Sequence, residues 1–318
     1  MKKIGILTSG GDAPGMNAAI RAVVRTALVN NIEVVGIHKG YLGLHEGEIF
    51  PMDRSSVSDI IQKGGTILKT ARFPEFAQPE VREKAAQVLK IYGIEGLVVI
   101  GGDGSFRGAK GLAELGIKTI GIPGTIDNDL GYTDRTIGFD TAQNTVIDAI
   151  NKIRDTSSSH QRVSVVEVMG RDCGDLALYA GLAGGATTIL VPEKKFTKEE
   201  IIKTVMDGKR QKKHHNLVVI AEGVGNSDEI AKEIEEISGI ETRLTVLGHI
   251  QRGGAPSAYD RILASRMGHR AVELLMEGKS ARVIGTVKGE IVDYDIHEAL
   301  TIKRPFNEKL YQIAMDLV

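Results

Sequence analysis

Short apolar runs recur along the chain, and most are followed by a glycine-containing turn and then by a stretch with helical spacing of apolar residues. Runs such as Leu97–Ile100 and Val163–Val168 have the length and β-branched composition of buried parallel strands. We therefore predict an α/β fold. The predicted strands span 3–8, 33–38, 97–100, 118–123, 163–168, 188–191, 217–221 and 243–247. The predicted helices span 16–30, 57–62, 79–92, 139–155, 198–210, 227–238 and 257–277, with others beginning near 105 and ending at 183.

The alternation of strands and helices falls into two sets. The polar segment Thr156–His160 is predicted to end the preceding helix, and a second series starts at Val163. We predict a turn at 39–43 and, near the end of the chain, a pair of strands over 283–292. The chain is therefore expected to form two α/β domains, with a boundary near residue 139.

Composition narrows the class of protein. The chain has 318 residues, of which 42% are hydrophobic and 25% charged, as in ordinary globular domains. A net charge of -1 gives no reason to expect binding to nucleic acid or to an anionic membrane. The single cysteine, Cys173, excludes an intrachain disulfide framework. Because no apolar run approaches the ~20 residues of a membrane span, and Ile4–Leu7 is too short for a signal sequence, we expect a soluble cytoplasmic protein.

The turn after Leu97–Ile100 has the composition of a phosphate-binding loop. Gly101, Gly102 and Gly104 let the backbone approach a ligand, and the following helix would direct unpaired N–H groups at an anion. Asp103 would repel a bare phosphate, but a carboxylate beside phosphates is a common Mg²⁺ ligand. The turn therefore predicts a site for a magnesium nucleotide.

A second loop follows the strand over 118–123 and carries two more acids, Asp127 and Asp129. One of them could act as a general base, while the alternative is that both acids only cap the local turn. Together, a magnesium nucleotide and a proton-accepting aspartate are the parts of a phosphotransferase.

Five motifs carry a family resemblance: TSGGDAPGMN at 8–17, GGDGS at 101–105, PGTIDND at 123–129, MGR at 169–171 and GHIQRGG at 248–254. With them the chain resembles bacterial ATP-dependent 6-phosphofructokinases from Lys3 to about Pro305. The resemblance implies two doubly wound, three-layer α/β/α domains with the active site in the cleft between them. The larger, ATP-binding domain would comprise 1–138 and 251–300, and the smaller, fructose 6-phosphate-binding domain 139–250 and 301–318.

The resemblance also implies roles for individual residues. Asp127 would be the general base and Asp103 the Mg²⁺ ligand, while Asp129, Thr125, Arg171 and Arg72 would complete the catalytic set. The implied ATP-binding residues are Gly11, Tyr41, Arg72, Phe73, Gly102, Asp103, Gly104, Ser105 and Gly108. The implied sugar-binding residues are Thr125, Ile126, Asp127, Arg162, Met169, Gly170, Arg171, Glu222, Arg243, His249, Ile250, Gln251 and Arg252.

In the family, Arg162 and Arg243 reach the site from a neighbouring subunit of a homotetramer, so a homotetramer with shared active sites is implied. Tyr41 could stack on adenine or simply pack. Phe73 and Ala77 are not the commonest residues of the family near the adenine pocket, which leaves open which nucleotide base is preferred.

The resemblance implies a second nucleotide site, for ADP as activator and phosphoenolpyruvate as inhibitor. Its residues would be Arg21, Ala22, Val23, Val24, Arg25, Arg54, Asp59, Arg154, Gly185, Ala186, Thr187, Gln211, Lys213, His214 and His215. A solvated charged stripe is the alternative for Arg21 and Arg25. Thr187 replaces a glutamate and Gln211 a basic residue, so a metal ligand and a phosphate contact are lost. We therefore predict a weak or altered effector response.

Other functions fit the sequence less well. Pyrophosphate-using relatives carry an aspartate at the position of Gly104 and a lysine at that of Gly124, so ATP is the expected donor. Tagatose 6-phosphate stays open as an acceptor. A Rossmann dehydrogenase would need a G-x-G-x-x-G spacing that the chain lacks, and Met16 and Asn17 depart from a Walker A motif. A non-catalytic nucleotide sensor would be suggested by loss of Asp103, Asp127 or Arg171, all of which are present.

Overall fold

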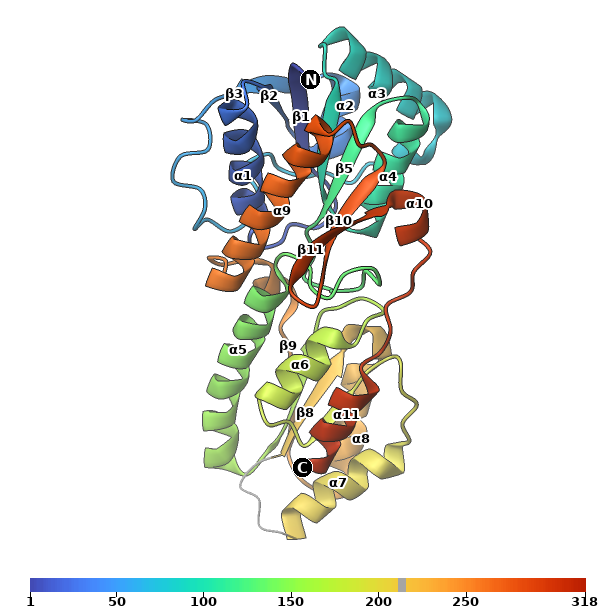
Figure 1. The fold of residues 1–318 in the computed structure, drawn as a ribbon. Coiled ribbons are helices and arrows are strands. Elements are labelled where there is room, and N and C mark those ends of the chain that lie inside the picture. The colour runs from blue at the N-terminus through green and yellow to red at the C-terminus, as the bar shows by residue number, and fades with distance from the viewer. Residues whose placement is uncertain (211–215) are drawn as a thin grey trace. The chain divides into compact units, whose positions relative to one another are not determined.

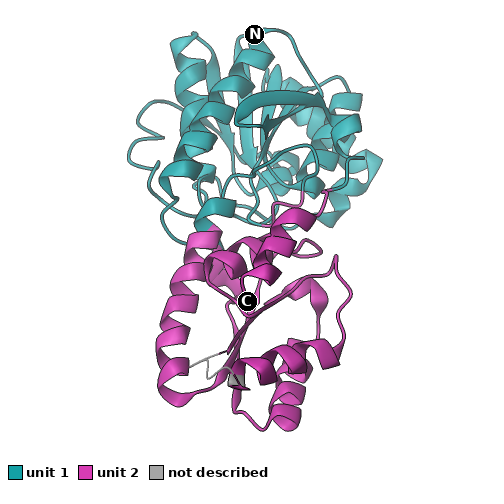
Figure 2. Ribbon diagram, turned by 60° about the horizontal axis from the view of Figure 1, so that its bottom comes forward, with its two compact units in different colours: residues 1–126, 130–141, 252–303 teal, residues 127–129, 142–251, 304–318 magenta. Residues whose placement is uncertain are grey.

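Alternating strands and helices build two α/β units in the computed structural model, which describes residues 1–210 and 216–318 (Figure 2). Unit 1 comprises residues 1–126, 130–141 and 252–303, and unit 2 comprises 127–129, 142–251 and 304–318. The predicted α/β class is confirmed. The short segment 127–129 groups with unit 2 although the residues on both sides of it belong to unit 1.

Unit 1 contains a seven-stranded sheet in the order β11-β10-β5-β4-β1-β2-β3, in which β3 and β11 are antiparallel to their neighbours. Its strands are β1 (Lys3–Thr8), β2 (Glu33–Ile37), β3 (Ile49–Met52), β4 (Gly96–Gly101), β5 (Lys118–Pro123), β10 (Arg282–Val287) and β11 (Glu290–Asp295). The chain winds outward from β1 in both directions, to β2 on one side and to β4 on the other. The carboxyl ends of β1 and β4 therefore flank a topological switch point, where open parallel sheets bind ligands.

Helices cover both faces of this sheet. On one face α1 packs against α9, and α2, α3 and α4 cover the other (Figure 1). These helices are α1 (Met16–Val29), α2 (Gly40–Glu46), α3 (Pro79–Ile91), α4 (Asp103–Glu114) and α9 (Ala258–Met276), with the short η1 (Pro74–Ala77) and α10 (Ile296–Ala299) beside them. Leu97 and Val99, two residues apart on β4, pack in one core cluster with Phe106 of α4 and Leu89 of α3. This spacing is the two-residue period of a strand.

Unit 2 contains a parallel four-stranded sheet in the order β7-β8-β6-β9. Its strands are β6 (Val163–Val168), β7 (Thr188–Leu190), β8 (Asn216–Ala221) and β9 (Thr242–Val246). Its helices are α5 (Phe139–His160), which starts within unit 1, α6 (Asp175–Ala183), α7 (Lys198–Arg210), α8 (Ser227–Ser238) and α11 (Glu308–Asp316), with η2 (Glu222–Val224) and η3 (Gly248–Arg252). Val163 and Val165 pack with α7 and α8, whereas Ser164 between them hydrogen-bonds Ser157 of α5. Helices therefore cover both faces of this sheet as well.

Three predicted elements are wrong. Residues 57–62 form turns and no helix, because the Asp53 carboxylate accepts hydrogen bonds from Ser55 and Ser56 and holds a local turn. Residues 40–46 form α2 where a turn was predicted, since Tyr41 and Leu44 are drawn into the core. The predicted break at 156–160 is the last part of α5, whose polar side chains bond back to carbonyls one turn earlier. Strand β3 was not predicted.

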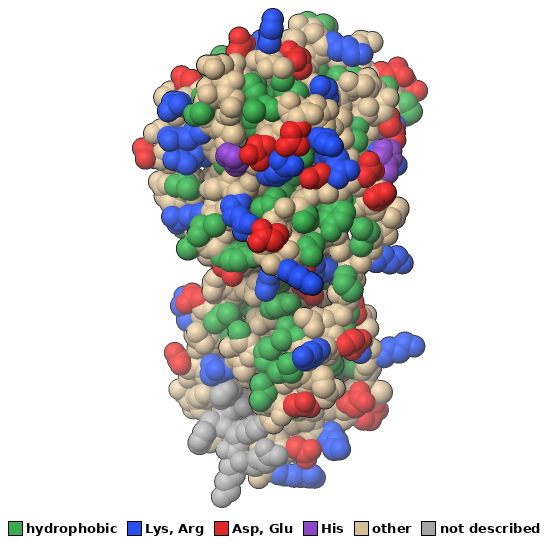
Figure 3. Space-filling view, viewed as in Figure 1, with side chains coloured by type: hydrophobic (Ala, Val, Ile, Leu, Met, Phe, Trp, Pro, Cys, Tyr) green, Lys and Arg blue, Asp and Glu red, His purple; other side chains and the backbone are tan. Residues whose placement is uncertain are grey.

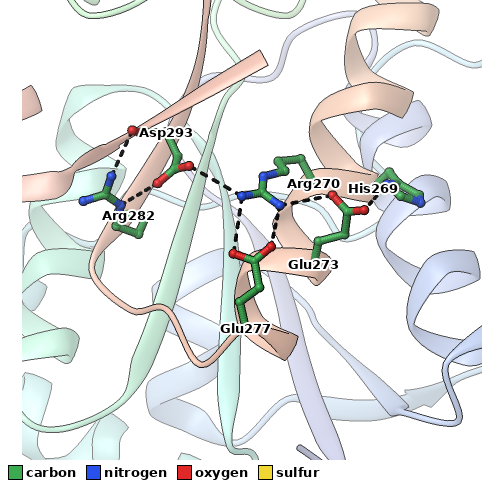
Figure 4. Close-up of polar contacts among 6 residues, drawn as sticks. All are labelled: His269, Arg270, Glu273, Glu277, Arg282 and Asp293. Carbon is green, nitrogen blue, oxygen red and sulfur yellow. Dashed lines mark hydrogen bonds and ion pairs between the residues drawn. The ribbon is translucent and has the colours of Figure 1, made fainter.

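Ion pairs join α9 to the β10–β11 hairpin in unit 1 (Figure 4). Arg270 on α9 lies 2.7 Å from Glu277, the residue that follows this helix, and 3.8 Å from Asp293 of β11. Asp293 also accepts a 2.7 Å hydrogen bond from Arg282 of β10. One carboxylate thus links two strands and a helix, so the network ties the edge of the sheet to its covering layer.

Acidic and basic side chains are interspersed over the face of the molecule shown in Figure 3. Within the two described ranges, no helix is both long and apolar enough to cross a bilayer.

Candidate active site

The turns after β1 and β4 lie side by side at the switch point of unit 1. The backbone N–H of Ser9 donates to the carbonyl of Ile100 over 2.9 Å. A Cβ on Gly101 would lie 2.5 Å from the Ser9 carbonyl oxygen, so only glycine allows this approach. Ser105 in the first turn of α4 is 4% exposed, and its hydroxyl has no hydrogen-bond partner among the residues described. A buried hydroxyl without a partner, at a helix N-terminus between two glycine turns, fits an anionic oxygen as its ligand.

Asp103 begins α4 and extends from the same turn. Its carboxylate pairs with Arg107, one helical turn later, with 2.8 Å between Oδ2 and Nε. Both side chains are substantially exposed, and an exposed pair of this kind contributes only ~0.5 kcal/mol. A divalent cation can therefore replace Arg107 at low cost. Apart from its chain neighbours and the backbone of its own helix, no described atom lies within 4 Å of where a Cβ on residue 104 would stand, which leaves room there.

Aromatic side chains pack next to this turn. Tyr41 is 5% exposed, its ring stacks on Phe76 with 4.0 Å between centroids, and its hydroxyl donates to the Ser105 carbonyl over 2.5 Å. Burial raises the pKa of Tyr41 well above its ordinary value. Tyr41 is therefore packed between Phe76 and the first turn of α4. Phe73 packs against the same cluster half-buried, and Arg72 before it is exposed.

Four more residues of unit 1 were predicted from the sequence to bind substrates, and they differ in their contacts and in their burial. Arg252 donates to the Asp12 carbonyl over 3.3 Å, and a Cβ on Gly11 would lie 2.4 Å from the Arg252 Nη1. Gly11 and Arg252 are thus brought together. Thr125 is fixed by a hydrogen bond from its N–H to the Ile137 carbonyl. Ile126 is fully buried, so its side chain belongs to the core.

In unit 2, the ends of β6 and β8 form a second group of polar residues. Glu222 accepts two hydrogen bonds through its Oε1, from the backbone N–H of Gly170 over 3.1 Å and of Arg171 over 2.6 Å. Gln251, fully buried, accepts from the N–H of Met169 over 3.1 Å. Gly170 and Arg171 have φ angles of 139° and 53°, in the region that disfavours side chains. Such conformations persist where surrounding contacts hold them, often at functional sites.

Asp127 lies beside this loop. It is 2% exposed, and its Oδ2 is 3.5 Å from the Nε of Arg171. Asn128 is fully buried and Asp129 partly buried. A buried carboxylate next to an arginine that is mostly exposed can accept a proton from a ligand hydroxyl and be stabilised electrostatically afterwards.

Arg162 and Arg243 lie elsewhere in unit 2. Arg162 directly precedes β6 and Arg243 is near the start of β9, so both are at the amino edge of the sheet. Glu241 lies between them: it accepts from Arg162 over 2.5 Å and also from Arg243. The hydrogen bond from Arg162 is the largest cause that lowers the pKa of Glu241. The structure brings these two arginines together but places them at the opposite end of β6 from Met169. His249 and Ile250 of η3 are exposed.

The residues selected for an effector site are dispersed over both units. Arg21, Ala22 and Arg25 of α1 are partly exposed, while Val23 and Val24 are fully buried in the core. Arg54 and Asp59 lie exposed in the turns after β3. In unit 2, Arg154 donates to the Gly184 carbonyl beside Gly185 and Ala186, and the Thr187 hydroxyl donates to the Leu217 carbonyl over 2.8 Å. Gln211, Lys213, His214 and His215 lie outside the described residues.

The family model described as Phosphofructokinase matches residues 3–275. ATP-dependent 6-phosphofructokinase 1 of Clostridium perfringens is 67% identical over 314 residues, which cover 99% of this chain and 98% of that relative. The ATP-dependent 6-phosphofructokinase of Clostridium tetani is 67% identical over 317 residues, or 100% and 99% of the two chains.

Solved structures agree in fold. Phosphofructokinase from Saccharomyces cerevisiae superposes with a TM-score of 0.92 at 33% identity; the match covers 99% of this chain and 50% of the yeast chain, so this chain spans half its length. The pyrophosphate-dependent phosphofructokinase from Marinobacter aquaeolei has a TM-score of 0.87 at 23% identity, over 99% and 92% of the two chains. The chain belongs to the phosphofructokinase family.

Proposed function

We propose that this protein transfers the γ-phosphoryl group of ATP to the 1-hydroxyl of fructose 6-phosphate, giving fructose 1,6-bisphosphate and ADP. The observation that carries the proposal is the buried Asp127 carboxylate beside Arg171, because this pair can accept a hydroxyl proton next to a cation. The Clostridium relatives, which share two thirds of their residues with this chain, are named ATP-dependent 6-phosphofructokinases, and this supports both substrates.

In this proposal ATP binds unit 1 and the sugar phosphate binds mainly unit 2. Phosphate oxygens would accept from the Ser105 hydroxyl and from the N–H groups of the first turn of α4. Mg²⁺, held by Asp103, would neutralise charge on the phosphates and on the transferring group. The space at Gly104 supports ATP over pyrophosphate as donor, since an aspartate side chain there would crowd and repel the α-phosphate.

The chemical step needs a base and cations at the transferring group. Asp127 would remove the proton from the 1-hydroxyl as its oxygen attacks the γ-phosphorus. Arg171 would then stabilise the charge that develops on the phosphoryl oxygens, with Arg72 on the nucleotide side. Glu222 fixes the backbone of Arg171 and Gly170, which holds the loop in a strained shape before substrate arrives. Thr125 and Asp129 complete the proposed catalytic set.

The phosphate of the acceptor sugar would bind His249, Arg252, Arg162 and Arg243. The last two lie at the amino edge of the unit 2 sheet, and the Met169–Arg171 loop lies at its carboxyl edge, about 20 Å away along β6 at ~3.3 Å per residue. One chain therefore cannot bring both groups to one sugar. We infer that the arginines serve the site of a second copy, which supports the proposed homotetramer.

A regulatory site is also proposed, with ADP as activator and phosphoenolpyruvate as inhibitor. Thr187 supports only a weak response, because its hydroxyl is already hydrogen-bonded to both backbone groups of Leu217. It offers no carboxylate for a metal-bound effector.

The test is a steady-state assay of Asp127→Asn beside the parent, with ATP, Mg²⁺ and fructose 6-phosphate. Loss of a general base should lower kcat by about a hundredfold or more while sugar binding persists. Asp228→Asn, which removes an exposed carboxylate of α8, is the control and should match the parent. A parent without activity on fructose 6-phosphate, or an Asp127→Asn variant as fast as the parent, would refute the proposal. Pyrophosphate and tagatose 6-phosphate are then substituted in the same assay.

A further inference from the structure

The loop that carries Asp127 is anchored through its central residue. The Asn128 side-chain amide donates to Oδ2 of Asp175 over 2.9 Å, and Arg304 donates to the same oxygen through Nε at 3.1 Å and Nη2 at 2.8 Å. Asp175 is the first residue of α6, and Arg304 begins the final segment of unit 2. Three distant parts of the chain thus converge on one carboxylate oxygen.

This group is buried. Asn128 is fully buried, Asp175 is 1% exposed, and the Arg304 side chain is 17% exposed. A buried carboxylate is costly unless it is paired and hydrogen-bonded, and Arg304 and Asn128 supply the charge and the donors. If one of the three side chains is removed, the others keep buried polar groups without their hydrogen-bond or ion-pair partner, so the three residues act as a unit.

The backbone of Asn128 explains why this anchor matters for its neighbour. Asn128 has a φ of 53°, in the left-handed region that asparagine enters more readily than most residues. Asn128 directly follows Asp127, so anchoring Asn128 restricts the backbone that carries the Asp127 carboxylate. Asp127 is also 3.5 Å from Arg171, whose side chain is 63% exposed.

We propose that Asn128, Asp175 and Arg304 form a positioning group that fixes the Asp127 carboxylate for proton transfer. The inference rests on the proposed function, in which Asp127 is the base. A misplacement of about 1 Å of a catalytic group can cost a hundredfold in rate without loss of binding. The group should therefore act on kcat and leave the binding of both substrates in place.

The experiment compares Asn128→Gly with Asn226→Gly. Asn226 also has a φ of 53°, but its side chain makes no cap hydrogen bond and no site role is assigned to it. Glycine accepts this backbone conformation at both positions, so the two variants match in backbone strain, and Asn128→Gly in addition loses a buried side chain together with its bond to Asp175. We expect Asn128→Gly to lower kcat about ten- to a hundredfold, with KM for fructose 6-phosphate and ATP within about threefold of the parent. Asn226→Gly should keep the parental kcat.

A second variant, Asn128→Asp, should change the pH dependence of kcat, which a loss of rigidity in the loop alone would not do. Asn128→Asp has the same shape but sets a carboxylate against that of Asp175, and two carboxylates at this distance cannot both ionise freely. Its kcat relative to the parent should fall as pH rises, because the added carboxyl then ionises beside Asp175, where Arg304 is the facing cation that limits the repulsion. Asn128→Gly should show a constant ratio over the same rise in pH.

The outcomes separate the two proposals. A parent that does not phosphorylate fructose 6-phosphate contradicts the proposed function itself. If the parent is active, then an Asn128→Gly variant with parental kcat, or one that changes only KM, overturns the positioning role. If Asn128→Gly does not fold by circular dichroism, the pH-dependent ratio of Asn128→Asp decides, and a ratio independent of pH overturns the inference.

Discussion

The Thr187 hydroxyl donates one hydrogen bond and accepts another within unit 2, at the place where the family resemblance implies an effector ligand. We expect ADP to shift the half-saturating fructose 6-phosphate concentration by less than about fivefold, the lower end of allosteric couplings. Saturation curves at several ADP and phosphoenolpyruvate concentrations measure this shift. Strong activation by ADP would show that the site works without a carboxylate at residue 187.

Single residues differed in how well the sequence predicted them. Gly101, Asp103 and Ser105 lie in one short stretch of the chain, so the composition of that stretch alone predicted a phosphate-binding turn. The structure has the buried Ser105 hydroxyl in this turn. Asp175 gave no such signal, because its partner Asn128 is 47 residues away and its partner Arg304 is 129 residues away. Glu241, which joins Arg162 and Arg243, and Phe76, which packs on Tyr41, were missed for the same reason.

At the scale of elements, α9 holds the start of α5 through one buried acid. Asp260 accepts hydrogen bonds from the N–H groups of Gly138 and Thr141 and from the Thr141 hydroxyl. Burial is the largest cause that raises the pKa of Asp260 from 3.8 to about 6. Between these two pH values the folded protein binds a proton that the unfolded chain has lost. The contribution of Asp260 to stability therefore falls as pH rises through this window, and it is constant above it.

We therefore predict that Asp260→Asn is less stable than the parent at every pH, since it loses hydrogen bonds, but that the gap narrows as pH rises. The narrowing between pH 4 and pH 7 should be about 3 kcal/mol, at ~1.4 kcal/mol per pKa unit. Urea unfolding at several pH values measures it. Asp148→Asn, at an exposed position of α5, is the control and should show no such change. A gap that stays constant would mean that Asp260 titrates normally.

Elements with a strong local pattern were predicted to the residue, including β1, β6, α7 and α8. Their apolar periodicity and their packing favour the same conformation. The errors arise where local and tertiary preferences differ. At 57–62 the apolar spacing is helical and Val57 is buried, yet the side chain of Asp53 competes for the backbone. At 40–46 the glycines indicated a turn, while burial of Tyr41 and Leu44 favoured a helix.

At the scale of the whole molecule, the proposed homotetramer would have each chain supply the base for one site and the phosphate-binding arginines for another. Arg162→Ala and Asp127→Asn should each be nearly inactive when made alone. Co-expressed, they should recover about a quarter of the parental activity, because some sites then combine an intact Asp127 with an intact Arg162 from a neighbour. Activity of the purified mixed oligomers measures this recovery.

A matched pair provides the control for this complementation. Arg162→Ala and Arg243→Ala both remove an arginine that binds the sugar phosphate in the proposal, and Glu241 joins these two arginines within one chain. Each site would then receive Arg162 and Arg243 from one chain, in which one of the two is alanine. A mixture of these two variants should therefore stay inactive. No recovery in the first mixture would place the arginines in the site of their own chain, and recovery in the control would mean that Arg162 and Arg243 reach one site from different chains.

Gln251 and Arg252 are adjacent in the chain but belong to different units. Gln251 is buried and bonded to the end of β6, while Arg252 is held against the turn at Gly11. The two attachments are thus made by consecutive residues. A substitution at one of these residues changes one of the two contacts. An insertion of a single residue between them would displace both the Gln251 hydrogen bond and the Arg252 contact. During divergence, the length of this segment is therefore constrained more tightly than the identity of most residues within it.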